Sequence, residues 1–200
     1  MGSYYYLAAQ LPNLVYGQSA PINFGYFEEL AEKFLDATDK AFFDMISLAP
    51  DSLGPEGDGT PSYAELPRST GCEFIDKWRE WERALRLNLA RYRSQRLKRD
   101  NVVSVEPPLL PVEASAAAAR AVAVSDSPLE AEEILDKARW DLIGSIQGLD
   151  SFSQDIIFAY KLKLLILERR LSFKTEEGFK EYKSLYAAIL DSAQSVGEAK

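Results

Sequence analysis

Apolar residues recur at steps of three and four along most of the chain, which is the spacing of one face of an α-helix. The clearest run lies between residues 73 and 99, where charged side chains separate a single apolar stripe. This pattern predicts a long amphipathic helix from about Glu73 to Arg99. Its stripe consists of Phe74, Trp78, Trp81, Leu85, Leu89 and Tyr92.

A second helix begins at Ser127-Pro128-Leu129-Glu130. Ser127 can accept a hydrogen bond from a free backbone N–H, Pro128 suits the first helical position, and Glu130 completes a capping box. We expect this helix to run to about Gln147 and to end at Gly148.

The next helix, from about Phe152 to Leu171, is apolar nearly all round and is therefore expected at the centre of a bundle. Its stripe is Ile156, Tyr160, Leu164, Leu167 and Leu171, widened by Phe158, Leu162, Leu165 and Ile166. A last helix is predicted after Thr175, with Phe179, Tyr182, Tyr186 and Ile189 facing inward.

The shorter elements are less sharply defined by their pattern. Residues 24–48 have helical spacing, and Thr38 or Asp39 would start a second helix within them. The alanine-rich stretch 113–124 fits either a short helix or a loose arm. The aromatic opening at Tyr4, before Pro12, fits either a strand or the first turn of a buried helix.

Proline and glycine break the pattern at 49–72, and prolines break it again at 100–112. We expect an all-α fold of six to seven helices with a short N-terminal aromatic segment. It would form a single all-helical domain over 1–200, or two diverged helical sub-units, 1–99 and 127–200, joined by a Pro/Ala-rich connector at 100–126. The likeness of 84–90 to 159–165 is compatible with a diverged helical repeat, but the pattern that any two amphipathic helices share is the preferred explanation.

Composition limits the chemistry that the chain can perform. Among its 200 residues there is no histidine and one cysteine, Cys72. Ser-His and Cys-His nucleophile pairs and histidine metal sites are therefore excluded, and an internal disulfide cannot form. We expect a protein that is not an enzyme, with no catalytic residue, no cofactor and no metal site.

Location is predicted from the absence of targeting features. The opening residues lack a basic region followed by an apolar core, so no secretory signal is expected. The most apolar stretch, 156–171, carries five charged residues and cannot span a membrane. These features, with a cysteine content that fits a reducing compartment, favour the cytoplasm.

The formal net charge of −8 conceals a basic cluster. Seven bases and no acid occur from residue 83 to residue 99. We expect a partner-binding face, opposite the tryptophan stripe, for an acidic protein or, less favoured, for RNA or lipid headgroups. The alternative is a solvated face balanced by acids elsewhere. The residues of this predicted face are Arg79, Arg83, Arg86 and Arg93.

Four further residues are candidates for docking or for the core. Asn88 lies beside the apolar stripe, where it would need hydrogen-bond partners and could fix how neighbouring helices dock; a half-open boundary position is the alternative. Trp78, Trp81 and Trp140 each lie in an amphipathic pattern, which favours the core over an interface. The acidic cluster from Glu130 to Asp136 is explained by the favourable interaction of acids with a helix N-terminus.

Several segments together resemble a bacterial family, domain of unknown function 2764. They are Tyr4-Tyr5-Tyr6-Leu7 with Leu11-Pro12, Trp81-Glu82 with Leu85-Arg86-Leu87-Asn88-Leu89-Ala90, and Pro128-Leu129-Glu130-Ala131-Glu132 leading into Arg139-Trp140. The likeness covers most of the chain. A weaker resemblance, carried by Asn88 with Arg93 and by the Pro-x-Glu helix start, is to the V-type ATPase component designated C (d in eukaryotes), here termed the socket component.

The resemblance implies a function. Members of the family are encoded among the subunits of bacterial V-type ATPases, in which the socket component is an all-helical body of three pseudo-repeats between the central stalk and the membrane ring. It implies a non-catalytic protein, either similar to the socket component or an assembly factor, at the cytoplasmic face of the inner membrane. The partners implied are the central-stalk subunits and the membrane ring, with membrane association only through them and with no nucleic acid. The chain is shorter than a full socket component.

Overall fold

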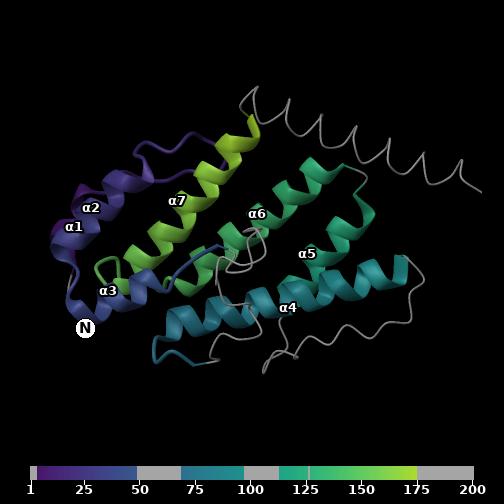
Figure 1. The fold of residues 1–200 in the computed structure, drawn as a ribbon, viewed down its shortest axis with the longest axis horizontal. Coiled ribbons are helices and arrows are strands. Elements are labelled where there is room, and N and C mark those ends of the chain that lie inside the picture. Colours follow the sequence, from purple (N-terminus) through teal and green to yellow (C-terminus); the bar gives the residue numbers. More distant parts are fainter. Residues whose placement is uncertain (1–3, 49–68, 97–112, 126, 175–200) are drawn as a thin grey trace, which may run out of the picture.

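The computed structural model describes residues 4–48, 69–96, 113–125 and 127–174. Over these ranges the chain forms seven α-helices and no strand, so the all-α prediction is confirmed (Figure 1). The helices are α1 (Tyr5–Gln10), α2 (Phe24–Phe34), α3 (Ala37–Asp44), α4 (Glu73–Arg96), α5 (Glu113–Val124), α6 (Pro128–Ile146) and α7 (Gln154–Lys174).

Packing between the longer helices defines the bundle. Helix α5 packs against both α4 and α6, and α6 lies side by side with α7 (Figure 1). Helix α2 covers another side of α7, and α1 packs on α2. The alanine-rich stretch is therefore a helix, and it lies within the segment that the sequence suggested as a connector.

The aromatic opening of the chain is helical. In α1 the Leu7 side chain is fully buried, whereas Tyr5 and Tyr6 are exposed. The backbone N–H of Tyr4 donates to the carbonyl of Phe152 at 2.8 Å, which joins α1 to the segment before α7. The Tyr4 hydroxyl also donates to the buried carboxylate of Asp39 in α3.

Side-chain caps determine where several helices begin. Asn23 caps α2 and Ser127 caps α6, the latter as predicted. The start of α3 was predicted wrongly, because Asp36, rather than Thr38 or Asp39, accepts from the free backbone N–H groups. Asp39 is instead engaged with Tyr4, so its side chain serves tertiary packing.

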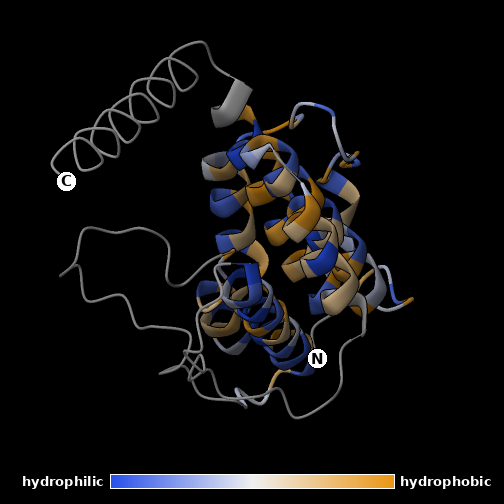
Figure 2. Ribbon diagram, turned by 90° about the vertical axis from the view of Figure 1, so that its right-hand side faces the viewer, coloured by the Kyte–Doolittle hydropathy of each residue, from blue (hydrophilic) through white to orange (hydrophobic). Residues whose placement is uncertain are grey.

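Helix α7 contributes many of the buried residues of the main core, as its apolar surface predicted. Figure 2 shows how hydrophobic and hydrophilic residues are distributed over the helices. Members of its apolar surface, such as Phe158, Leu162 and Leu164, are completely buried. Leu171 is 52% exposed, so the predicted stripe stops contributing to the core before its last residue. A second, smaller cluster lies between α4, α5 and α6 and contains Trp81, Leu85, Ala118, Ala119 and Leu135.

Two glycines end or begin helices through left-handed backbone conformations. Gly148 follows α6 with a φ of +74°, which confirms the predicted end of that helix. Gly71 precedes α4 with a φ of +88°. Cys72 comes next and is buried, which raises the pKa of its thiol.

Some predicted features lie outside the described residues. They are the Pro/Gly-rich segment 49–68, the part of the basic cluster beyond Arg96, the break at 100–112 and the helix predicted after Thr175.

Candidate functional site

A network of buried charges connects three helices at the middle of the bundle. Arg139 on α6 donates from Nε to Oε1 of Glu82 on α4 at 2.6 Å. Both side chains are buried, and Arg139 also lies 3.4 Å from Oδ1 of Asp136, one turn earlier on α6. Each charge thus faces an opposite charge, which offsets part of the cost of removing it from water.

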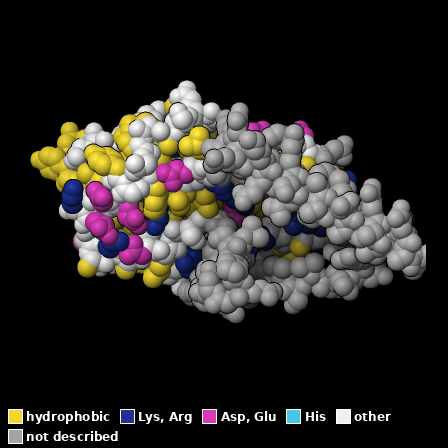
Figure 3. Space-filling model, turned by 45° about the horizontal axis from the view of Figure 1, so that its top comes forward, with side chains coloured by type: hydrophobic (Ala, Val, Ile, Leu, Met, Phe, Trp, Pro, Cys, Tyr) yellow, Lys and Arg dark blue, Asp and Glu magenta, His cyan; other side chains and the backbone are white. Residues whose placement is uncertain are grey.

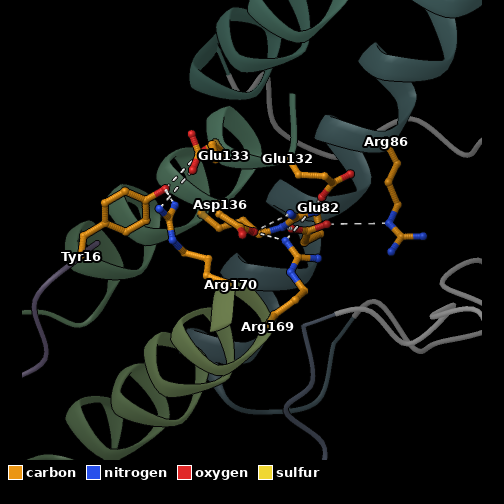
Figure 4. Close-up of polar contacts among 9 residues, drawn as sticks. Tyr16, Glu82, Arg86, Glu132, Glu133, Asp136, Arg169 and Arg170 are labelled. Atoms are coloured by element: carbon orange, nitrogen blue, oxygen red, sulfur yellow. Dashed lines mark hydrogen bonds and ion pairs between the residues drawn. The ribbon is translucent and has the colours of Figure 1, made fainter. Parts of the chain in front are cut away.

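Helix α7 joins this network through Arg169. Its guanidinium donates to Oδ1 of Asp136 and lies 3.7 Å from Oε2 of Glu132 (Figure 4). Arg86 approaches Glu82 from the other side, with 3.7 Å between Nε and Oε2. The chain of contacts therefore runs from α4 through α6 to α7.

A second polar contact ties the segment before α2 to the end of α7. The Tyr16 hydroxyl donates to the backbone carbonyl of Glu133 at 3.0 Å and accepts from Arg170. Arg170 also lies 3.4 Å from the Glu133 carboxylate (Figure 4). The guanidinium carbon of Arg170 is 4.5 Å from the centre of the Tyr16 ring, so a cation–π contact adds to this junction.

These contacts serve helix docking. Buried arginine–carboxylate pairs fix the orientation of the helices that carry them, because a slipped register would leave charges uncompensated. Within the described ranges, no group of three acidic or cysteine side chains could hold a metal ion.

The predicted arginine face is not a continuous exposed surface. Arg79 and Arg83 are only 5% and 4% exposed, and Arg83 pairs with Glu80 at 2.8 Å. Arg86 is partly buried, and Arg93 is exposed. The prediction of one face is therefore corrected: the first half of α4 buries side chains on several sides, which leaves its exposed arginines at its C-terminal end.

Asn88 docks two helices, as one of its two sequence interpretations expected. Its Nδ2 donates to Oγ of Ser115 on α5 at 3.2 Å, and Ser115 is fully buried. This hydrogen bond links the middle of α4 to the first turn of α5. Asn88 itself is partly buried, which also fits the boundary position.

The tryptophans belong to the core rather than to a surface. Trp78 and Trp81 are buried, with stacked rings 6.3 Å apart, and Trp78 Nε1 donates to the carbonyl of Ser47. Among the described residues, Trp81 Nε1 has no hydrogen-bond partner. Trp140 is partly buried and packs edge-on against Tyr16 at 5.4 Å.

A groove of about 820 Å³ runs along α6. Its lining on α6 extends from Glu130 to Ser145, which corresponds to about 22 Å at 1.5 Å per residue. The floor of the groove consists of apolar and mostly small side chains, and the side chains at its rim are mostly charged. The floor includes Ala117, Ala118, Ala121, Ile134, Ala138 and Leu142; the rim includes Glu130, Glu133, Lys137, Asp141 and Arg170.

An aromatic patch lies at the opposite end of the molecule from the C-terminal end of α4 (Figure 1). Tyr5, Tyr6 and Phe152 are exposed, and the Tyr5 ring lies 5.7 Å from the ring of Tyr6 and 4.9 Å from that of Phe152. Figure 3 shows hydrophobic side chains gathered at the end of the molecule where α1 and α2 lie in Figure 1. Contiguous exposed apolar side chains of this kind mark interaction surfaces.

The buried charges of this network were not predicted from the sequence. Glu82 lies four residues after Trp78 and three before Leu85, so it falls within the apolar stripe. That position could have indicated burial with a partner. Asp136 was assigned to the acidic helix start, but its burial and its two arginine contacts provide a different reason for its place.

Comparison with known proteins gives no match: no family model, curated protein or solved structure resembles this chain significantly. Of the helices that the structure describes, none is long and apolar enough to cross a membrane.

Proposed function

We propose that this protein is a non-catalytic component of a bacterial V-type ATPase, similar to the socket component, or an assembly factor of that complex. It would act in the cytoplasm, at the face of the inner membrane, and link the central stalk to the membrane ring by protein–protein contacts. The resemblance of its sequence segments to the V-type ATPase-associated family motivates the proposal, and the groove along α6 is the observation that carries it.

The groove has the form that receives a partner helix. An apolar floor between helices binds the apolar stripe of an amphipathic helix, and alanines allow close approach of the two backbones. Charged residues such as Glu130 and Lys137 at the rim would select orientation and partner. In this proposal the occupant is a helix of a central-stalk subunit.

The buried charge network supports a mechanical role. It joins α4, α6 and α7 by contacts whose loss is expensive, so these helices would move as one body when a partner applies force. A component between a rotating stalk and a ring requires such stiffness.

The test is co-purification of the tagged protein with central-stalk subunits from native membranes. Ala117→Trp places a large side chain in the groove from an exposed position on α5, and it should abolish recovery of the stalk subunits. Val124→Trp, on the same helix and exposed but outside the groove, is the matched control and should retain them.

Two results would contradict the proposal. Absence of stalk subunits from both washed and chemically crosslinked preparations of the unaltered protein would reject both the stable component and the assembly factor. Equal recovery with both tryptophan variants would reject the groove as the contact surface.

A second candidate function rests on the exposed C-terminal end of α4. Arg91, Arg93 and Arg96 are exposed there, so the geometry also supports an adaptor that binds an anionic partner. Binding to RNA or to anionic vesicles would weaken steeply with salt, because neutralised phosphates release counterions. Flat salt dependence, or no binding at low salt, would reject it.

A further inference from the structure

A cleft separate from the groove lies where α1 meets the junction of α6 and α7. It has a volume of about 350 Å³, within the range of small-molecule sites. One wall comes from residues 11–14 after α1, and the other comes from Ile156, Tyr160 and Lys163 of α7. Gln147, at the end of α6, closes the polar end.

Among the described residues, Lys163 is the only formally charged side chain that lines this cleft. Its Nζ donates to Oε1 of Gln147 at 2.8 Å and lies 5.5 Å from the centre of the Trp140 ring. Burial lowers the pKa of Lys163. No carboxylate in the described part of the chain forms an ion pair with it, whereas Lys40 and Lys77 pair with acids at 2.6 and 2.7 Å.

Lys161, the other buried lysine of α7, differs in this respect. It is nearly inaccessible, and it donates to the carbonyl of Phe43 at 2.7 Å while lying 4.0 Å from the centre of that ring. Its ammonium therefore has its partners within the protein. Lys163 instead reaches a cleft and has an amide and an aromatic face as neighbours, so its charge is not neutralised by the described residues.

The remainder of the cleft is mainly apolar, with Asn13 and Ser151 as further polar lining, and it is held in place. Leu11, Leu14, Phe152 and Ile156 supply its walls. The Tyr160 hydroxyl donates to the carbonyl of Pro12 at 3.0 Å, which fixes the segment after α1 against α7. A ligand that fits this surface has an anionic end near Lys163 and an apolar body toward Phe152.

We propose that this cleft binds a small monocarboxylate with an apolar body, such as a medium-chain fatty acid. The carboxylate accepts from Lys163 Nζ and from the amide nitrogen of Gln147, and the apolar body lies against Leu14 and Ile156. A charge-assisted hydrogen bond to a partly desolvated ammonium supplies the selectivity for the anion, and burial of the body supplies most of the affinity.

The test is calorimetric titration of the full chain with sodium octanoate, with neutral octanamide as the isosteric probe. Octanoate should bind with a stoichiometry of one, and octanamide should bind at least about tenfold more weakly, as loss of one charged hydrogen bond predicts. Lys163→Met should weaken octanoate binding by the same factor and leave octanamide binding unchanged. Lys163→Arg should retain part of the preference for octanoate.

Two controls make the result specific. Lys137→Met removes an exposed lysine of α6 that does not line the cleft, and it should leave octanoate affinity unchanged. Amide chemical-shift changes caused by octanoate should be confined to residues 8–14 and 147–163. Equal affinity for octanoate and octanamide, unaltered binding to a folded Lys163→Met variant, or shift changes centred elsewhere would each overturn the proposal.

Discussion

Arg139 and Glu82 face each other across α6 and α4 with 2.6 Å between Nε and Oε1, 57 residues apart in the sequence. Both side chains are buried from solvent. A pair of this kind adds little net stability compared with apolar residues of the same size, but it makes one particular docking of the two helices much better than its neighbours. It joins α4 directly to α6, in addition to the packing of α5 against both helices.

Removal of one partner of this pair should be costly. Arg139→Met leaves the Glu82 carboxylate buried with a weakened set of partners, and we expect the free energy of unfolding to fall by about 3–5 kcal/mol. Urea denaturation monitored by circular dichroism measures this change in the free energy of unfolding. Lys137→Met, which breaks the exposed pair with Asp141 on the same helix, should change stability by less than about 1 kcal/mol.

The double variant Glu82→Met with Arg139→Met separates two explanations. If uncompensated charge causes the loss, then removal of both charges should restore much of the stability. A double variant as unstable as the sum of the single variants would instead indicate that packing of the two stems carries the effect.

The Asn88–Ser115 hydrogen bond should couple α4 to α5. A double-mutant cycle with Asn88→Ala and Ser115→Ala is expected to give a coupling energy of about 0.5–1.5 kcal/mol. Asn88→Ala alone should also speed hydrogen exchange in α5. Additive losses, with unchanged exchange in α5, would show that the contact at 3.2 Å does not hold the two helices together.

Replacement of Gly144 and of Gly148, which lie within and just after α6, by alanine should change the free energy of unfolding in opposite directions. Gly148 has a φ of +74°, which an alanine adopts only with strain, so Gly148→Ala should destabilise by about 1 kcal/mol. Gly144 lies within α6, and a Cβ there would meet nothing within 4 Å among the described residues. Gly144→Ala should therefore stabilise by about 0.4–1 kcal/mol. Thermal denaturation of both variants tests the pair, and shifts of the same sign would contradict it.

Lys161 should make stability depend on alkaline pH. Burial lowers the pKa of Lys161 from 10.5 to about 8, so between these values the unfolded chain binds more protons than the folded one. The contribution of Lys161 to the free energy of unfolding therefore rises with pH in this window, by at most about 1.4 kcal/mol per pH unit.

The comparison with Lys161→Met isolates this contribution. Burial also raises the pKa of the Cys72 thiol, which acts in the opposite direction, but Cys72 is common to both proteins. The stability of the unaltered protein relative to Lys161→Met should rise between about pH 8 and the unperturbed lysine pKa of 10.5, as measured by urea denaturation. Parallel curves would show that Lys161 does not titrate there.

The helices could be predicted because their determinants are local. Each of these determinants acts on residues close to it in the sequence. They include the apolar stripe through Trp78 and Leu85, the Ser127 cap and the helix-ending Gly148. Asp36 was missed at the start of α3 because Thr38 and Asp39 offer equally good capping chemistry within the next turn. In the fold the Asp39 side chain is engaged by Tyr4, and Asp36 accepts from the free N–H groups of Thr38 and Asp39.

The candidate site was harder to predict, since its charges are defined by partners far away in the sequence. An arginine at helical spacing is typical of a solvated face, and nothing near Arg79 or Arg83 in the sequence indicates that neighbouring segments cover them. Glu82 and Asp136 meet their arginines only after α4, α6 and α7 have packed. Asn88 was the exception, because an amide at the margin of an apolar stripe requires a partner wherever the stripe is buried.

The buried Cys72 thiol allows local opening of the fold to be measured by its rate of chemical labelling. As the only cysteine, placed immediately before α4, it can react with a thiol reagent only when that end of the helix separates from the core. The ratio of its labelling rate to that of the unfolded chain would measure the free energy of that opening without any introduced probe. Repeated with the Arg139→Met protein, the same measurement would show whether the charge network holds α4 shut over its whole length or only at its middle.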